Sequence, residues 1–242
     1  MKRKLVFWTA FNSYRSSKLL RNKPASAAHP VTTQEWTNRR AELFVKYTLP
    51  SILNQTYEDF LYVVLLDPNL RHLTELLFPE VDDRVIYCYE DAQALDLIRD
   101  YDEVVMALID SDDMYSRWAG ELMMACPAEW MYFRRGYAYE ERRGRLWHYD
   151  TIGVGPFFAR RVHPADIAVF DRDKRHPTHK DVIRMCPHRL ADGNFCVVLH
   201  GANTSSTPTM RYVLKRPAER TVLFERFAFG HKTGGSDEYR LL

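Results

Sequence analysis

Three short apolar runs, separated by segments with helical periodicity, limit this chain of 242 residues to a small set of folds. The runs are LVFWTAF at 5–11, FLYVVLLD at 60–67 and VVMALI at 104–109. Continuous apolar runs of this length are typical of strands that are buried on both faces of a parallel sheet. The alternation of such strands with helices predicts an α/β fold built from βαβ units.

The segments between the runs supply the predicted helices. A helix is expected before Leu49-Pro50, where it kinks or breaks because proline lacks the amide donor that a helix interior needs. A further strand is predicted at 84–89, with Asp91 as the N-cap of the short helix after it. Ser116 is the expected N-cap of the helix that follows the third run.

After about residue 125 the character of the sequence changes. Residues 130–139 and 146–149 predict an antiparallel hairpin around Arg143-Gly144, and 157–162 and 195–200 predict further strands. Glutamates interrupt the arginines of this hairpin, so a solvated surface with cross-strand ion pairs is expected. The predicted fold class is therefore α/β with a mixed sheet, in which a parallel half precedes a smaller half.

Composition and charge fit a folded protein. Hydrophobic residues make up 46% of the chain and charged residues 27%, which is an ordinary balance for a globular domain. Residues 1–150 hold 19 Lys and Arg against 23 Asp and Glu, whereas residues 151–242 hold 15 against 9. An acidic half that can hold a cation and a basic half that can face an anion fit a metal and diphosphate site, although solvated surface charge gives the same split.

Targeting signals and cysteine spacing give weaker expectations. The basic residues 1–4 precede an apolar run that is too short for a signal peptide, and no run reaches the roughly 18 to 20 apolar residues of a membrane helix. A cytoplasmic protein without a transmembrane segment is expected, with peripheral membrane contact left open. The four cysteines are scattered without metal-binding spacing, so buried, reduced thiols are predicted.

The third apolar run ends in the acidic sequence Asp110-Ser111-Asp112-Asp113. In open α/β sheets, ligands bind outside the carboxyl ends of the strands. Thr9, Phe11 and Asp67, at the ends of the first two runs, are expected at the same edge.

Carboxylates this close together repel one another unless a cation or hydrogen-bond donors compensate, and oxygen ligands suit Mg²⁺ and Mn²⁺. A metal site is therefore predicted at the acidic loop, with an acidic turn that caps the next helix as the alternative. If the loop is partly exposed and crowded, Asp112→Asn should leave the free energy of unfolding unchanged or slightly higher.

Longer sequence patterns resemble a known family. Residues 49–60 (LPSILNQTYEDF), VVLLD at 63–67 and IDSDD at 109–113 resemble family 2-type GT-A glycosyltransferases, which carry S-I-x-x-Q-T-x-x-x-F, a strand ending in aspartate and then D-x-D-D. With Arg40 and HGANT at 200–204 included, the chain most resembles the family of putative rhamnosyltransferases. The resemblance covers residues 5–125 well and the remainder only at isolated points.

This resemblance implies one GT-A-like domain over 1–242, with a nucleotide-binding half at 1–125 and an acceptor-side half at 126–242. It implies metal-dependent transfer of a sugar, with rhamnose as one candidate, from a UDP- or dTDP-linked donor. The acceptor would be a glycan or another hydroxyl group, and the configuration at the sugar would be inverted. Nucleic acid is not an expected partner, and the oligomeric state is left open.

The family likeness also implies roles for single residues. Thr9, Phe11 and Asp67 are expected to contact the nucleotide, and Asp110 and Ser111 the donor. The sequence L-D-P-N around Asp67 replaces the commoner D-D-G-S, which leaves the identity of the base open.

The metal, Mn²⁺ or Mg²⁺, is expected at Asp110 and Asp112, with His200 as a further ligand. Imidazole beside carboxylates is acceptable to Mn²⁺. A histidine that is merely hydrogen-bonded at the end of its strand is the alternative for His200.

Sugar transfer needs a carboxylate base that takes the proton of the acceptor hydroxyl. The resemblance favours Asp181, close to the start of a predicted helix. The pattern Thr178-x-x-Asp181 is also a capping box, so a purely structural role is the alternative. Asp113 is the reserve candidate for the base.

Two other functions fit parts of the sequence. Aspartates at a strand end also serve metal-dependent phosphoryl transferases and nucleases, although the chain lacks an obvious glycine-rich phosphate loop. A non-catalytic module that binds glycans or nucleic acid through the basic, aromatic hairpin would not require the acidic loop.

Overall fold

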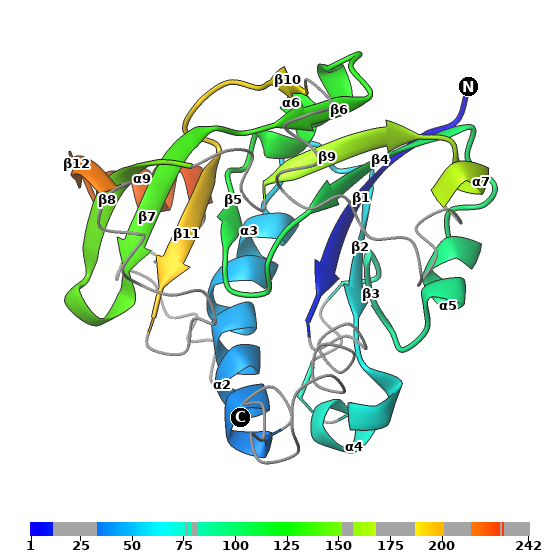
Figure 1. The fold of residues 1–242 in the computed structure, drawn as a ribbon, viewed down its shortest axis with the longest axis horizontal. Helices are drawn as coiled ribbons and strands as arrows, with labels where there is room; N and C mark the ends of the chain where they lie inside the picture. The colour runs from blue at the N-terminus through cyan, green and yellow to red at the C-terminus, as the bar shows by residue number, and fades with distance from the viewer. Residues whose placement is uncertain are drawn as a thin grey trace, which may run out of the picture.

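The computed structural model describes residues 1–11, 33–75, 77–78, 82–151, 157–167, 187–200, 214–227 and 229. These residues form a mixed α/β structure with two sheets (Figure 1). The large sheet has the strand order β10-β6-β9-β4-β1-β2-β3, and the small sheet has the order β12-β8-β7-β11-β5. The predicted mixed α/β class is thus confirmed.

The element bounds are as follows. The large sheet contains β1 (Arg3–Ala10), β2 (Phe60–Leu65), β3 (Val85–Cys88), β4 (Glu103–Leu108), β6 (Trp130–Tyr132), β9 (Phe158–Val162) and β10 (His188–Arg189). The small sheet contains β5 (Met114–Tyr115), β7 (Arg135–Glu140), β8 (Arg145–Asp150), β11 (Phe195–Leu199) and β12 (Leu214–Ala218). The α-helices are α2 (Gln34–Leu43), α3 (Leu49–Leu53), α4 (Arg71–Thr74), α5 (Asp91–Asp96), α6 (Ala119–Ala125), α7 (Pro164–Ile167) and α9 (Thr221–Phe227).

Four parallel strands make up one side of the large sheet. β1 pairs with β2 on one side and with β4 on the other, and β3 joins β2. The carboxyl ends of these strands therefore share one edge of the sheet. β9 runs antiparallel to both β4 and β6, which makes the sheet mixed. The strands predicted at 5–11, 60–67, 84–89 and 104–109 are the four parallel ones.

The helical segment is continuous through Leu49-Pro50, where a kink or a break was predicted. α2 passes into α3 through a π-helical turn, Phe44–Thr48. The amide of Leu49 bonds to the carbonyl of Phe44, five residues earlier. The hydrogen-bond pattern is therefore already widened where Pro50 enters without an amide donor, and the segment does not end there. Figure 1 shows α2 and α3 running between the two sheets.

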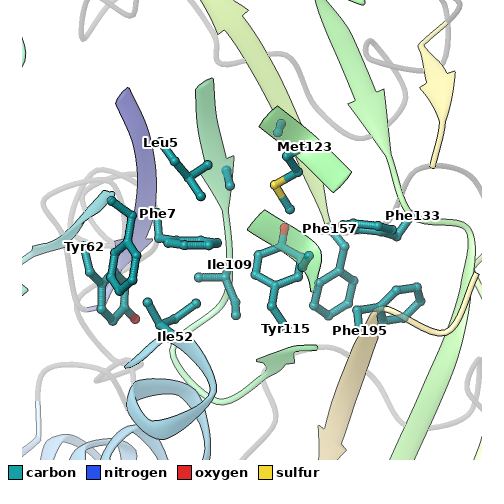
Figure 2. Close-up of a cluster of buried hydrophobic side chains, with 14 of the residues drawn as sticks. Leu5, Phe7, Ile52, Tyr62, Ile109, Tyr115, Met123, Phe133, Phe157 and Phe195 are labelled. Carbon is teal, nitrogen blue, oxygen red and sulfur yellow. The ribbon is translucent and has the colours of Figure 1, made fainter. Parts of the chain in front are cut away.

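A row of buried aromatic rings joins the two sheets (Figure 2). Phe7 of β1 lies 5.8 Å from Tyr115 of β5, measured between ring centroids. Tyr115 lies 5.6 Å from Phe157, which stacks on Phe195 of β11 at 4.1 Å. All four side chains are fully buried, and aromatic residues contribute large apolar areas to a core. The small sheet is thus packed against the large one through a shared core.

The predicted hairpin is formed by β7 and β8. Gly144 lies in its turn with a φ of 59°, a left-handed conformation that glycine adopts without strain. Arg134 and Arg135 both pair with Asp150, which confirms the expected ion pairs of this surface.

Three local predictions were wrong. The run 130–139 is split between β6 of the large sheet and β7 of the small one, because alternation of apolar residues does not specify which sheet a segment joins. The hydroxyl of Ser116 donates to Asn194 instead of capping the next helix. The N-cap of α5 is Glu90 and not Asp91.

The cysteines that the structure describes are free and buried, as predicted, and they are Cys88, Cys126 and Cys196. Burial raises the pKa of Cys196 well above its ordinary value, so this thiol stays protonated. Cys186 lies outside the described residues. Within the described part of the chain, no helix has the length and apolar character to cross a membrane.

The close approach of β7 to β11 at Gly136 gives a test of the fold. A Cβ atom at Gly136 would lie 2.4 Å from the carbonyl oxygen of Phe195, and backbone cannot yield without disturbing the sheet. We therefore predict that Gly136→Ala lowers the free energy of unfolding by about 2 to 3 kcal/mol. The control Gly144→Ala adds only the strain of an alanine in a left-handed backbone conformation. It should lower the free energy of unfolding by about 1 kcal/mol. Urea unfolding measures both, and equal losses in the two variants would contradict the close approach.

Candidate functional site

The acidic loop connects β4 to β5 at the edge where the parallel strands end, and two hydroxyl groups fix its start. Thr9 donates to the carbonyl of Ile109 at 3.0 Å, and Tyr115 donates to the carbonyl of Leu108 at 2.6 Å. Burial raises the pKa of Tyr115 well above its ordinary value, so its hydroxyl keeps the proton that it donates. The loop therefore leaves the sheet in a defined direction.

Asp113 extends the pairing between β5 and β11. Its Oδ1 accepts the amide of Val198 at 2.9 Å, just beyond the backbone pairs of these two short strands. Asp113 is 4% exposed, and burial raises its pKa well above the ordinary value. The negative charges of Asp112 and Asp110 raise it further. The side chain thus holds the end of β11 against the loop.

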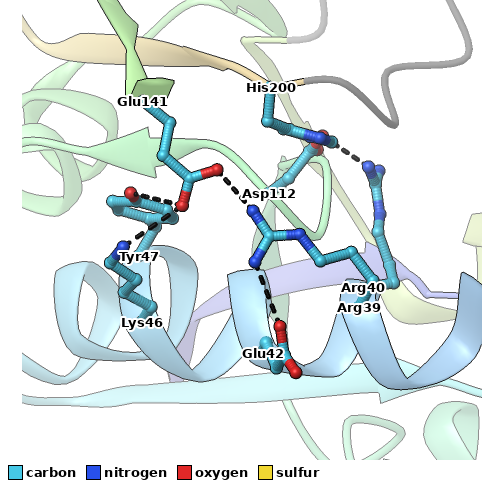
Figure 3. Close-up of polar contacts among 8 residues, drawn as sticks. All are labelled: Arg39, Arg40, Glu42, Lys46, Tyr47, Asp112, Glu141 and His200. Carbon is cyan, nitrogen blue, oxygen red and sulfur yellow. Dashed lines mark hydrogen bonds and ion pairs between the residues drawn. The ribbon is translucent and has the colours of Figure 1, made fainter. Parts of the chain in front are cut away.

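Asp112 contacts side chains from two distant parts of the chain (Figure 3). Its Oδ2 accepts from Nη1 of Arg40 in α2 and lies 2.6 Å from Nε2 of His200, the residue after β11. Arg40 also donates from Nε to the hydroxyl of Ser111 at 2.7 Å. Asp112 is 4% exposed and the Arg40 side chain 12%, so the ion pair is largely buried. The structure thus brings together Asp112 and His200, two of the predicted metal ligands.

The three loop carboxylates fit a divalent cation. One oxygen each of Asp110, Asp112 and Asp113 lie within 4.8 Å of one another. Asp110 is exposed, and the other two are buried. The hydrogen bonds described above use Oδ2 of Asp112 and Oδ1 of Asp113, so the second oxygen of each can meet an ion. An all-oxygen cluster suits hard cations such as Mg²⁺ and Mn²⁺.

The residues predicted at the nucleotide are buried. Thr9 and Asp67 have no exposed surface, and Phe11 is 3% exposed. The hydroxyl of Thr9 lies 2.9 Å from that of Tyr62, and a carboxylate oxygen of Asp67 accepts the amide of Asn69 at 2.9 Å. These side chains lie beneath the strand ends, and their contact with a nucleotide stays a prediction.

The two candidates for the catalytic base have different standing. Asp181 lies outside the described residues, so its role stays a prediction. Asp113 is nearly buried and accepts the amide of Val198, which suits a structural role better than contact with an acceptor.

A second set of charged contacts, which the sequence did not reveal, connects α2 and the π-helical turn after it to the hairpin (Figure 3). Glu141 accepts from Arg39, from Lys46 at 3.1 Å and from Tyr47 at 3.0 Å. Burial alone would raise the pKa of Glu141, but hydrogen bonds from Lys46 and Tyr47 and the charge of Arg39 outweigh it, so the pKa lies below its ordinary value. Adjacent arginines of α2 therefore pair with different segments, Arg39 with the hairpin and Arg40 with the acidic loop.

Sequence reasoning also missed the contact of Arg40 with the loop. One signal was present, because Trp36 and Arg40 are four residues apart on a predicted helix and their side chains can meet. The guanidinium carbon indeed lies 5.6 Å from the Trp36 ring centroid. That contact orients the Arg40 side chain, but it does not indicate which carboxylate the side chain contacts.

Part of the chain is similar to a known protein family. Residues 16–104 match the model of the family described as "Putative rhamnosyl transferase". This match confirms the predicted family resemblance. Such a family suggests a glycosyltransferase with a sugar donor and an acceptor. The matched segment includes Arg40 and residues 49–60 and ends before the acidic loop. No curated protein matches the sequence.

One solved structure that the comparison matched is 4-diphosphocytidyl-2C-methyl-D-erythritolsynthase from Anaerococcus prevotii. The two chains are 8% identical, with 93% of this chain and 94% of the other covered and a TM-score of 0.35. A likeness at this level carries no conclusion about fold or activity.

The contacts of Asp112 reverse the effect that Asp112→Asn is expected to have on the free energy of unfolding. The loop is not simply crowded, because Arg40 neutralises Asp112, and removing the negative charge leaves that largely buried arginine without its ion-pair partner. We predict that Asp112→Asn lowers the free energy of unfolding by about 3 kcal/mol. Asp113→Asn, which removes a buried carboxyl group with a raised pKa and keeps an acceptor for Val198, should change it by less than about 1 kcal/mol. Urea unfolding in chelator decides, and two equally stable variants would contradict the ion pair.

The lowered pKa of Glu141 predicts a pH-dependent contribution to stability. A depressed folded pKa means that the stabilisation is present above the ordinary glutamate value of 4.5 and is lost as pH falls through the folded pKa. At pH 7 the free energy of unfolding of Glu141→Gln should therefore be about 1 to 2 kcal/mol lower than that of wild type. This difference should shrink below about pH 4.5. Glu42→Gln is the matched control, since Glu42 is an exposed partner of the same Arg39. Melting curves from pH 3 to 7 test this, and a gap that persists at pH 3 would refute it.

Proposed function

We propose that this protein is a metal-dependent glycosyltransferase. It would move a sugar, with rhamnose as the first candidate, from a UDP- or dTDP-linked donor to a hydroxyl group of a glycan or other acceptor. The observation that carries the proposal is the cluster of Asp110, Asp112 and Asp113 at the end of β4, close after the segment that matches the rhamnosyl transferase family. Ligands of open α/β sheets bind at this edge.

The sheet supports a GT-A-like arrangement. The parallel strands β3, β2, β1 and β4 would belong to a nucleotide-binding half over 1–125, and the strands from β6 to β12 to an acceptor-side half over 126–242. We propose that the halves act as one domain, because the largest core cluster takes side chains from both sheets.

The side chains of the acidic loop have different proposed roles in binding the metal and the donor. Bound Mn²⁺ or Mg²⁺ would neutralise the diphosphate as it leaves the sugar. We propose Asp110 and Asp112 as ligands, with His200 as a third, because the last two are already in contact. The proposed contacts with the donor are Ser111 and the exposed Asp110. Thr9, Phe11 and Asp67 are the proposed contacts with the nucleotide, which requires the residues that cover them to move aside.

The proposed reaction is a single displacement. The acceptor oxygen bonds to the anomeric carbon of the sugar while the bond from that carbon to the diphosphate oxygen breaks, which inverts the configuration. The acceptor proton passes to a carboxylate, for which we propose Asp181 on the sequence alone.

A metal-dependent phosphoryl transferase or nuclease is the second candidate, because the same carboxylate cluster suits such chemistry. A nucleic-acid-binding module has less support, because Arg134 and Arg135 of the hairpin are paired with Asp150. Binding of a nucleoside diphosphate and turnover of a sugar nucleotide distinguish these possibilities.

Interdependent binding of metal and nucleotide is the main test. With Mn²⁺ present, dTDP or UDP should bind at least tenfold more tightly than in excess chelator, because the ion bridges the loop and the phosphates. Asp110→Asn should keep the melting temperature, since Asp110 is exposed, but should abolish this gain and lower turnover on the order of 100-fold. Calorimetry and release of nucleoside diphosphate from dTDP-rhamnose are the measurements.

The exposed Asp96→Asn serves as a control that removes an equal charge away from the loop. Nucleotide affinity that is the same in chelator and in Mn²⁺ would exclude the metal-bridged site. Metal-dependent cleavage of a nucleic acid without sugar-nucleotide turnover would favour the second candidate.

A further inference from the structure

Arg40 brings a fixed positive charge into the acidic loop. Its guanidinium donates to Oδ2 of Asp112 and to the hydroxyl of Ser111, and it lies over the ring of Trp36. The Arg40 side chain is only 12% exposed. It is therefore held from several sides and differs from a flexible surface arginine that could simply swing away.

This charge lies where a metal ion would be bound. The three loop carboxylates converge within 4.8 Å, and Arg40 contacts one of them directly. A divalent ion binds carboxylate oxygens at about 2.0 to 2.6 Å, so an ion on Asp112 would share a single carboxylate with the guanidinium. Like charges at such a distance repel strongly where water is largely excluded.

His200 adds a second constraint on the same atom. Its Nε2 lies 2.6 Å from Oδ2 of Asp112, the oxygen that also accepts from Arg40. The loop therefore has internal compensation for part of its negative charge before any ion arrives. Figure 3 shows the arginine and the histidine converging on Asp112.

We propose that Arg40 is an internal cation that competes with the divalent metal for Asp112 and makes tight metal binding depend on the donor diphosphate. This inference rests on the proposed function. Without nucleotide, the repulsion by Arg40 weakens metal binding. The diphosphate supplies further negative charge, so the ion and the guanidinium can then be held together, with the phosphate oxygens as additional acceptors for Arg40. The metal and the nucleotide are coupled through this residue.

The test compares Mn²⁺ affinity without nucleotide in variants of Arg40. Arg40→Gln keeps a hydrogen-bond donor but loses the charge, and it should bind Mn²⁺ alone about tenfold more tightly than wild type. Its affinity should then rise less on addition of dTDP or UDP. Arg40→Lys keeps the charge and should bind Mn²⁺ alone no more tightly than wild type. Electron paramagnetic resonance of free Mn²⁺ gives these affinities without any turnover.

Arg39→Gln is the matched control, because it removes the same charge from the neighbouring residue of α2, whose partners are Glu42 and Glu141. It should leave Mn²⁺ affinity unchanged. Mn²⁺ binding by Arg40→Gln that is equal to or weaker than that of Arg39→Gln would overturn the proposal. If Arg40→Gln is unstable, tighter Mn²⁺ binding by Arg40→Lys than by wild type would overturn it equally.

Failure of the proposed function would look different. In that case wild type would show no gain in Mn²⁺ affinity with either nucleoside diphosphate. A wild-type gain that persists unchanged in Arg40→Gln would leave the glycosyltransferase site standing and reject only the role of Arg40.

Discussion

The buried carboxylate of Asp112 is the contact on which the arrangement of the site depends. It joins the acidic loop to Arg40, 72 residues earlier, and to His200, 88 residues later. A carboxylate removed from water needs donors in place of its hydration shell, so α2 and the end of β11 must both approach the loop. Asp113 supports the same geometry from the next position, because it holds β11 through the amide of Val198. The arrangement of the site is thus maintained by the free energy that would be lost if these buried groups were left unpaired.

Much of the fold could be predicted from the sequence, because its central strands are continuous apolar runs. Such runs mark strands that are covered on both faces, and the strands at 5–11, 60–67 and 104–109 are central in the large sheet. The pattern could not assign 130–139 to two sheets, because alternation describes which faces are covered and not which neighbours pair. Nor could it show that a π-helical turn carries the helix past Pro50, since that depends on hydrogen bonds five residues apart.

For the site, the sequence indicated where the acidic residues lie in the fold, but it did not indicate which side chains they contact. The acidic residues could be placed at a strand end, and parallel strands bring their carboxyl ends to one edge. The contact between Arg40 and Asp112 joins a helix to a loop in different βαβ units, and no local spacing encodes it. Glu141 was expected only as one of two glutamates in a solvated hairpin, whereas its three donors come from α2 and the turn that follows. Electrostatic pairing of this kind requires the tertiary structure.

The π-helical turn has a consequence for the length of this segment. A turn of this type holds one residue more than an α-helical turn, so loss of one residue from Phe44–Thr48 would allow a regular helix. In a regular helix, by contrast, loss of one residue rotates the preceding part by about 100° and moves it by about 1.5 Å. Because the π-helical turn absorbs the extra residue, Arg40 could still face the acidic loop after such a loss while Ser51 keeps its contact with the amide of Tyr115. The number of residues between Arg40 and Ser51 can therefore differ by one at this turn, and an alignment that opens a one-residue gap there would still pair equivalent arginines.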